Sequence, residues 1–141
     1  MDMQEIVTKA YNIAVDAHKG QFRHDGKTPY MEHPWRVMRR VQYNDYDWTY
    51  RTVALLHDVL EDTEVTAKDL LDQGIPENIV YAVITLTKEE GIDYGSYLDK
   101  IKMNELARVV KIADMIDNLA DKPSKKQIIK YATGLLALVE D

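Results

Sequence analysis

The chain has 141 residues, of which 45% are hydrophobic, and it contains only 6 glycines and 4 prolines. This composition predicts one compact domain over residues 1–141 with a continuous core. No apolar run reaches the length of about 18 residues that would span a bilayer. The N-terminus mixes charges into a helical pattern, so we expect a soluble, cytoplasmic protein without a membrane partner.

The net charge and the absence of cysteine exclude further kinds of binding site. A formal charge of -6 argues against binding to a nucleic acid polymer, because neutralising many phosphates requires a basic face. A small anionic substrate needs only local positive charge; alternatively, the acidity serves solubility alone. Without cysteine there is no disulfide and no thiolate zinc site, so nitrogen and oxygen ligands would have to hold any metal.

Apolar residues recur at helical spacing along nearly the whole chain, while strand-like alternation occurs nowhere for long. We therefore predict an all-α fold, a bundle of about six to eight helices. In chain order they are expected at about 2–18, 31–43, 48–60, 67–72, 76–86, 97–102, 105–120 and 125–140. The segment 48–60 is apolar on most sides and predicts a central helix, whereas TKEEGIDYG predicts a loop and DKPSKK a short solvated connector.

The feature that points to chemistry is the pair His57 and Asp58 in the apolar segment ALLHDVLEDT. Burying both groups is costly unless pairing, hydrogen bonds or a metal ion satisfies them. Glu61 and Asp62 each follow one of them by four residues, which predicts three carboxylates beside one imidazole on one helix face or its continuation. Such close like charges require a nearby cation or protonation, so this is a candidate active site.

Other polar residues also stand at unusual places. His33 begins a predicted helix in PYMEHPW, and Asp114 interrupts an apolar helix that carries Asn118 four residues later on the same face. Each has a simpler explanation on its own: His33 as a helix cap, Asp114 as a hydrogen-bonded core residue, and the His57–Asp58 pair as a hydrogen-bonded core pair. The residues by themselves establish only a cluster of unusually placed His and Asp side chains.

Four blocks, in order, resemble the HD-domain phosphohydrolases, and within them the hydrolase domain of RelA/SpoT-type alarmone enzymes and their small stand-alone relatives. The blocks are AHKGQFRHDGKTPYMEHP at 17–34, ALLHDVLEDT at 54–63, ITLTK at 84–88 and VVKIADMIDN at 109–118. The resemblance implies one divalent metal ion, Mn2+, whose ligands are His33, His57, Asp58 and Asp114. Two nitrogens and two carboxylates also suit iron or zinc.

The resemblance further implies a substrate and its chemistry. The resembling hydrolases cleave guanosine nucleotides with a 3′-pyrophosphate (ppGpp, pppGpp) at the ribose 3′-oxygen and release pyrophosphate. Glu61 and Asp62, in the EDT motif, are implied to position and deprotonate the attacking water. The residues implied to contact the substrate are Arg23, Tyr30, Lys88 and Asn118. Alternatively, Arg23 is an exposed loop arginine.

The last block departs from the pattern LADRLHN that is common in that family. Met115 stands in place of the arginine, Asp117 in place of the histidine, and Asp121 follows where a basic or polar residue is usual. These changes are expected to remove positive charge beside the phosphate site, which leaves another nucleotide or a dinucleotide phosphate open as substrate. A second alternative is a nucleotide-binding module without turnover, against which the intact Glu61 and Asp62 argue. The expected partner is a small nucleotide, and a homo-oligomer stays open.

Overall fold

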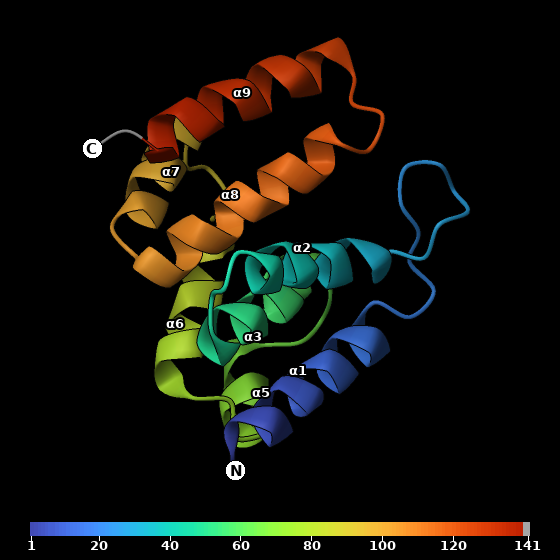
Figure 1. The fold of residues 1–141 in the computed structure, drawn as a ribbon, viewed down its shortest axis with the longest axis vertical. Coiled ribbons are helices and arrows are strands. Elements are labelled where there is room, and N and C mark those ends of the chain that lie inside the picture. Colours follow the sequence, from blue (N-terminus) through green and yellow to red (C-terminus); the bar gives the residue numbers. More distant parts are fainter. Residues whose placement is uncertain (140–141) are drawn as a thin grey trace.

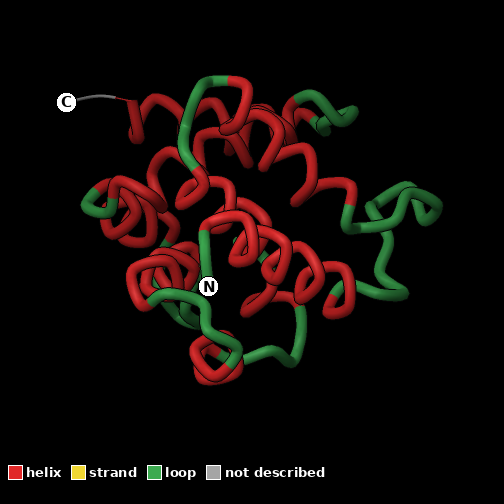
Figure 2. Tube along the Cα trace, turned by 60° about the horizontal axis from the view of Figure 1, so that its bottom comes forward, coloured by secondary structure: helices red, strands yellow, loops and turns green. Residues whose placement is uncertain are grey.

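The computed structural model describes residues 1–139, which form helices joined by loops (Figure 1). The helices are α1 (Met3–Ala17), α2 (Glu32–Tyr43), α3 (Trp48–Leu56), α4 (Val59–Asp62), α5 (Ala67–Asp72), α6 (Glu77–Leu86), α7 (Tyr94–Lys102), α8 (Glu105–Leu119) and α9 (Lys125–Val139). Figure 2 shows helices and loops but no strand among these residues. The all-α prediction is confirmed, and none of the described helices is long and apolar enough to cross a membrane.

Helix α3 lies at the centre of the bundle, packed against α1, α2, α6 and α8 (Figure 1). It begins where the Asp47 side chain accepts a hydrogen bond from the Thr49 amide, and residues 53–56 at its other end are 0% exposed. The prediction of a central helix is confirmed for this part. Helix α8 packs in turn on α2, α3, α6, α7 and α9, so α3 and α8 together place their polar residues in the interior.

The single helix predicted over 48–60 is wrong at one point, because the structure interrupts it at His57 and Asp58. The ring Nδ1 of His57 donates to the carbonyl oxygen of Ala54 at 2.6 Å. A side chain that bonds to its own helix in this way competes with the main-chain hydrogen bonds. Helix α3 therefore ends at Leu56, and the one-turn helix α4 starts at Val59. Counted as one interrupted helix, α3 and α4 leave eight helices within residues 1–139, as many as the sequence predicted at most.

The remaining boundaries agree closely with the predicted ones, except at α7. This helix begins at Tyr94 rather than 97, inside the segment that was predicted to be a loop. The Asp93 carboxylate caps it by accepting from the Ser96 amide at 3.2 Å and from the Ser96 hydroxyl at 2.7 Å. Gly95, which favoured a loop, occupies the first helical turn. The predicted end of the last helix, at 140, lies outside the described residues.

The loop over 18–31 projects from the bundle between α1 and α2 (Figure 1). Its turn is built on the Asp25 carboxylate, which accepts from the Lys27 and Thr28 amides at 2.8 Å and from the Thr28 hydroxyl. These hydrogen bonds hold the pKa of Asp25 well below its usual range. An antiparallel bridge between Phe22 and Pro29 closes the loop. The backbone that carries the side chains of the loop is therefore held in one conformation.

Candidate active site

The four predicted metal ligands come from three places in the chain and converge in the interior. His33 lies in the first turn of α2, His57 and Asp58 at the break after α3, and Asp114 in the middle of α8. The Oδ1 atom of Asp114 lies 2.7 Å from His33 Nε2 and 3.3 Å from His57 Nε2. The Oδ2 atom of Asp58 lies 3.1 Å from His57 Nε2. One ligand atom from each of His33, His57 and Asp58 falls within 4.8 Å of the others.

Both imidazoles turn Nδ1 away from the cluster and Nε2 into it. Nδ1 of His57 faces the Ala54 carbonyl, and Nδ1 of His33 lies 2.8 Å from Oδ2 of Asp117. Such acceptors hold a proton on Nδ1 and leave Nε2 as the ligand atom. Two carboxylate oxygens lie within 3.3 Å of His57 Nε2, yet this buried nitrogen makes no well-aligned hydrogen bond to any described residue. A cation is the group that would satisfy it.

The charges of the cluster also favour a cation. Burial alone would lower the pKa of His33 and of His57, but the surrounding carboxylates outweigh burial and raise both pKa values. Burial likewise opposes ionisation of Asp58 and Asp114, yet their pKa values are lowered, chiefly by His57 and by Lys111 respectively. A divalent ion can take the place of the imidazole protons, and nitrogen and carboxylate donors suit such an ion. The residues therefore fit a divalent metal.

Asp117 belongs to this site in a way that the sequence did not predict. Its carboxylate is 1% exposed and accepts from His33 Nδ1 at 2.8 Å, from Arg36 Nε at 3.0 Å and from Arg40 Nε at 3.2 Å. Asp117 thus lies behind His33 rather than beside a phosphate site. Met115 is fully buried, with its sulfur close to Gly134 of α9. The expectation that these two positions remove charge from the substrate pocket is wrong, because neither side chain lines it.

A pocket of about 750 Å³ opens over the cluster. His33, Asp58 and Asp114 contribute to its lining, whereas His57 does not. All six residues that the sequence predicted for catalysis or substrate contact line the pocket: Arg23, Tyr30, Glu61, Asp62, Lys88 and Asn118. The structure therefore brings the complete predicted set into one place.

Glu61 and Asp62 stand at the open side of the pocket, next to Asp58. Partial desolvation, and then the neighbouring Asp58 charge, raises the pKa of both carboxyl groups. Oε1 of Glu61 accepts a hydrogen bond from the Lys88 amide at 3.3 Å. A carboxylate with a raised pKa is a better proton acceptor, which suits both residues to activating a water.

Arg23 and Asn118 connect the projecting loop to α8. The Arg23 side chain is 10% exposed, so it is not the exposed loop arginine of the alternative reading. Its Nη2 donates to Asn118 Oδ1 and to Asp121 Oδ2, both at 3.0 Å. Asn118 donates in turn to Asp114 Oδ1 at 3.3 Å. Asp121 therefore holds Arg23 in position at the edge of the pocket.

Tyr30 contacts the cluster directly. Its hydroxyl donates to Asp58 Oδ2 at 2.6 Å and lies 3.3 Å from Asp62 Oδ2. Burial and the Asp58 charge raise the pKa of the phenol far above its usual value, so it stays a donor. Tyr30 thus links one candidate ligand to one candidate catalytic carboxylate.

Three lysines of the pocket were missed by sequence reasoning. Nζ of Lys111 donates to Asp114 Oδ2 at 3.0 Å, and the only signal was a lysine three residues before Asp114 in an apolar helix. Lys126 and Lys130 line the pocket from α9. Lys126 belongs to the segment DKPSKK, which was predicted to be solvated, and it is exposed while it lines the pocket. Its place depends on α9 packing against α8, which no local pattern reveals.

Comparison with known proteins identifies the family. The model of the HD domain family matches residues 30–119, which is more than half of the chain. The chain belongs to the HD domain family. All four candidate ligands of this HD domain protein lie inside the matched range.

Curated relatives include guanosine nucleotide enzymes. A guanosine-3′,5′-bis(diphosphate) 3′-pyrophosphohydrolase of Vibrio cholerae is 33% identical over 153 residues, which cover 92% of this chain and 20% of that protein. The bifunctional (p)ppGpp synthase/hydrolase SpoT of Escherichia coli is 36% identical over 104 residues, which cover 74% of this chain and 13% of SpoT. The chain thus spans a fifth or less of these two proteins.

A shorter relative matches over most of its length. The guanosine-3′,5′-bis(diphosphate) 3′-pyrophosphohydrolase MESH1 of Xenopus tropicalis is 33% identical over 129 residues, which cover 82% of this chain and 69% of MESH1. A solved structure described as a metazoan ortholog of SpoT that hydrolyzes ppGpp superposes with a TM-score of 0.79 over 95% of this chain and 83% of that chain. At 23% identity this likeness shows a shared fold.

Proposed function

We propose that this HD domain protein is a metal-dependent phosphohydrolase that removes the 3′-pyrophosphate of ppGpp or pppGpp. The observation that carries the proposal is the convergence of two imidazoles and two carboxylates beneath a pocket with both basic and acidic side chains. The substrate is supported by relatives that are named as hydrolases of guanosine-3′,5′-bis(diphosphate) or (p)ppGpp.

We assign Nε2 of His33, Nε2 of His57 and the carboxylates of Asp58 and Asp114 as the ligands, and Mn2+ as the ion. Bound there, a divalent ion supplies a Lewis acid for a phosphoryl oxygen and lowers the pKa of water. The protein fixes the rings through their Nδ1 atoms, one on the Ala54 carbonyl and one on Asp117.

In the proposed reaction, water attacks the phosphorus that is bonded to the ribose 3′-oxygen. The bond from that phosphorus to the 3′-oxygen breaks, pyrophosphate leaves, and the 3′-oxygen takes up a proton to become a hydroxyl. Glu61 and Asp62 orient the attacking water and take its proton, a role that their raised pKa values favour. Tyr30 keeps Asp62 beside Asp58 through its shared hydroxyl contacts.

The basic lining of the pocket suits the phosphates of such a nucleotide. Lys88, Lys126 and Lys130 supply positive charge around the open side. Arg23 is held by Asn118 and Asp121, so its planar guanidinium is presented to a base or a phosphate in one orientation. From the sequence, Asp121 was expected to reduce the positive charge beside the phosphate site. In the structure it instead holds the positively charged Arg23 in place.

The decisive experiment incubates the protein with ppGpp and Mn2+ and identifies the products by mass. We expect GDP and pyrophosphate from the wild type and none from Asp58→Ala. The matched control is Asp99→Ala, which removes an exposed carboxylate on α7 and should leave turnover unchanged. Full activity of Asp58→Ala would refute the assignment.

The same assay separates the alternatives. A panel of other nucleotides and dinucleotide phosphates is run beside ppGpp under identical conditions. Faster turnover of another compound would change the assigned substrate but leave the assigned metal ligands as they are. Tight binding of a nucleotide without any turnover would identify a binding module instead.

A further inference from the structure

A second pocket, of about 820 Å³, lies between α2 and α8. Its arginines are Arg36, Arg39 and Arg40 of α2 and Arg108 of α8, and we call it the arginine groove. Most of the α8 residues that line it lie on the face opposite to Lys111 and Asp114, because positions 109, 113 and 116 point away from 111, 114 and 118 on a helix. The groove is therefore separate from the candidate active site.

The charge of the arginine groove is exceptional for this chain. The protein has 6 arginines and a formal charge of -6, yet four of these arginines line one pocket to which no acidic residue among 1–139 contributes. Concentrated positive charge of this kind attracts anions, and guanidinium groups prefer phosphate and carboxylate oxygens. Arg36 and Arg40 also hold Asp117 behind His33, but the proposed hydrolysis assigns no role to Arg39 or Arg108.

Two of the arginines are held in place with donors to spare. Arg36 and Arg40 both direct Nε to the buried Asp117, at 3.0 and 3.2 Å. Among the described residues, their terminal nitrogens make no hydrogen bond; the nearest ionic contact is from Arg36 Nη2 to Asp121 Oδ2, at 3.8 Å. A guanidinium that is fixed through Nε offers its outer edge to a ligand at little cost in conformational entropy.

Within the described part of the chain, the other two arginines also lack firm partners. Arg39 lies over the Trp35 ring, 6.0 Å from its centroid. Nε of Arg108 is buried without a hydrogen-bond partner in the described chain, and the closest carboxylate oxygen, from Glu105, is 4.0 Å away. An unsatisfied buried donor in the wall of a pocket is a position where a bound acceptor would be favourable.

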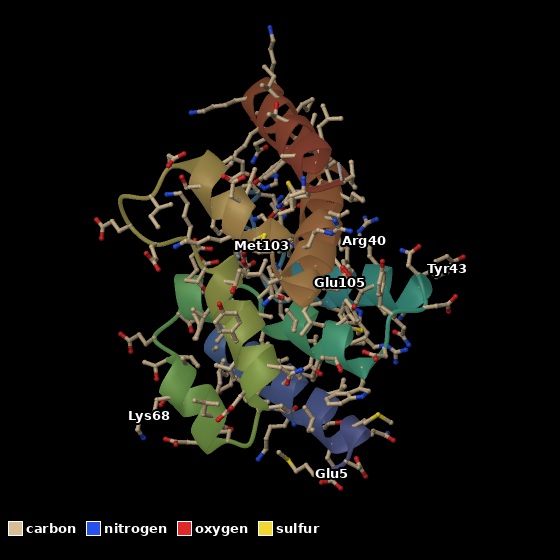
Figure 3. All side chains as sticks on the ribbon, turned by 90° about the vertical axis from the view of Figure 1, so that its left-hand side faces the viewer. Glu5, Arg40, Tyr43, Lys68, Met103 and Glu105 are labelled. Atoms are coloured by element: carbon tan, nitrogen blue, oxygen red, sulfur yellow. The ribbon has the colours of Figure 1, made fainter. Side chains whose placement is uncertain are left out.

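The floor of the groove is apolar and its mouth is aromatic. Val109, Ile112 and Ile116 of α8 form part of the floor. Tyr43 is 88% exposed and stands with Tyr46 at the end of α2; Figure 3 shows Tyr43 there, beyond Arg40. Arginines recognise phosphate, whereas an apolar floor and tyrosine rings suit a flat organic body. The volume lies in the range typical of small-molecule sites, about 300–1,000 Å³.

We propose that the arginine groove is a second binding site, for an organic phosphate of the nucleotide class. The volume of the groove and its apolar floor favour such a molecule over an acidic peptide, which would require an extended surface. The groove belongs to the same chain as the metal centre but binds its ligand on the other side of α8. The proposal does not depend on which nucleotide the metal centre hydrolyses.

The test uses the full chain loaded with Mg2+, a diamagnetic ion that leaves amide NMR signals visible. GDP is titrated in, and the shifts of the amide signals locate it. We expect residues 40–46 and the groove positions 108, 109, 112, 113 and 116 to respond, apart from any response of the pocket over the metal centre. The double variant Arg39→Ala/Arg108→Ala should weaken the groove response by about tenfold or more. Neither residue contacts Asp117 or a candidate ligand, so turnover should be unchanged.

Lys19→Ala/Lys68→Ala removes the same charge from exposed positions and should bind GDP as the wild type does. Shifts confined to the pocket over the metal centre, or unaltered groove affinity in the arginine variant, would overturn the proposal. So would equal affinity for inorganic phosphate, or binding of a polyglutamate peptide without binding of GDP. Because the readout is binding, a failure of ppGpp hydrolysis would leave this result interpretable.

Discussion

Nδ1 of His33 and Oδ2 of Asp117 lie 2.8 Å apart in the interior of the protein. This contact fixes the ring of a candidate metal ligand, and Arg36 and Arg40 fix Asp117 in turn. Burial opposes the ionisation of Asp117, but His33 and Arg36 outweigh it and lower the pKa of the carboxyl group well below its usual range. Asp117 thus supports the site from behind the His33 ring.

Asp117→Asn removes the negative charge behind His33 and should weaken metal binding. Loss of such an outer carboxylate typically costs about 10- to 100-fold in metal affinity. The affinity is measured by competition with a coloured chelator, and circular dichroism verifies that the variant is folded. Asp121→Asn is the control, because Asp121 contacts Arg23 and not His33. Equal affinity of both variants and the wild type would show that the contact is only structural.

Metal affinity should rise with pH. The raised pKa values of His33 and His57 mean that protons occupy the metal-free site, and an ion must displace them. Protonated imidazoles stabilise the metal-free fold fully below their unfolded pKa of about 6.5, and this contribution is lost as pH rises through the raised values. The increase in Tm caused by Mn2+ should therefore grow between about pH 6 and pH 9. A constant increase across that interval would contradict proton displacement.

Glu61→Gln should abolish most turnover without releasing the ion. Removing a general base costs about 100- to 10,000-fold in kcat. Glu61 is close to Asp58 but is not one of the assigned ligands, so metal content, measured by elemental analysis, should match the wild type. Glu64→Gln, an exposed neighbour, provides the comparison. If the variant lost its metal together with its activity, Glu61 would have to be counted among the metal ligands.

Arg23→Ala should impair substrate binding more than chemistry. Hydrogen bonds to a charged group contribute about 1.5–3 kcal/mol, which corresponds to roughly a tenfold or greater rise in KM. Metal affinity should not change, because Arg23 reaches Asp114 only through Asn118. Lys27→Ala removes an exposed charge from the same loop and should behave as the wild type. An unaltered KM in Arg23→Ala would exclude Arg23 from the substrate site.

The stability of the bundle should depend strongly on α3. Leu55 is fully buried at the centre, so Leu55→Ala leaves a cavity and should lower the free energy of unfolding by about 2–5 kcal/mol. Leu71, on α5, is 44% exposed, and Leu71→Ala should change the free energy of unfolding by about 0.5 kcal/mol or less. Urea unfolding followed by circular dichroism measures both. Similar losses for the two variants would contradict the central position of α3.

Sequence patterns predicted the helices well because most of them bury one apolar face. The residues themselves marked His33, His57, Asp58 and Asp114 only as unusually placed polar side chains, and the resemblance to HD-domain phosphohydrolases joined them into one predicted ligand set. The break at His57 was not foreseen, because it depends on a hydrogen bond from the ring to Ala54 that spacing alone does not show.

The role of Asp117 was missed for a different reason. Its meaning depends on α2 lying against α8, so that His33 and two arginines meet one carboxylate. Lys126 depends in the same way on α9. The partners of a polar residue depend on tertiary packing, and a local sequence pattern does not show which distant residues will be in contact.

Helix α8 separates the arginine groove from the pocket over the metal centre. Between positions 108 and 118, no face of this helix is therefore free of contacts or of a pocket. Each position from 108 to 118 lines one of the two pockets or is buried. Neutral drift is therefore expected to be slow along this stretch. A descendant lineage that acquired a new substrate while keeping its ion would change the loop over 18–31 and helix α9, and would inherit α8 nearly intact.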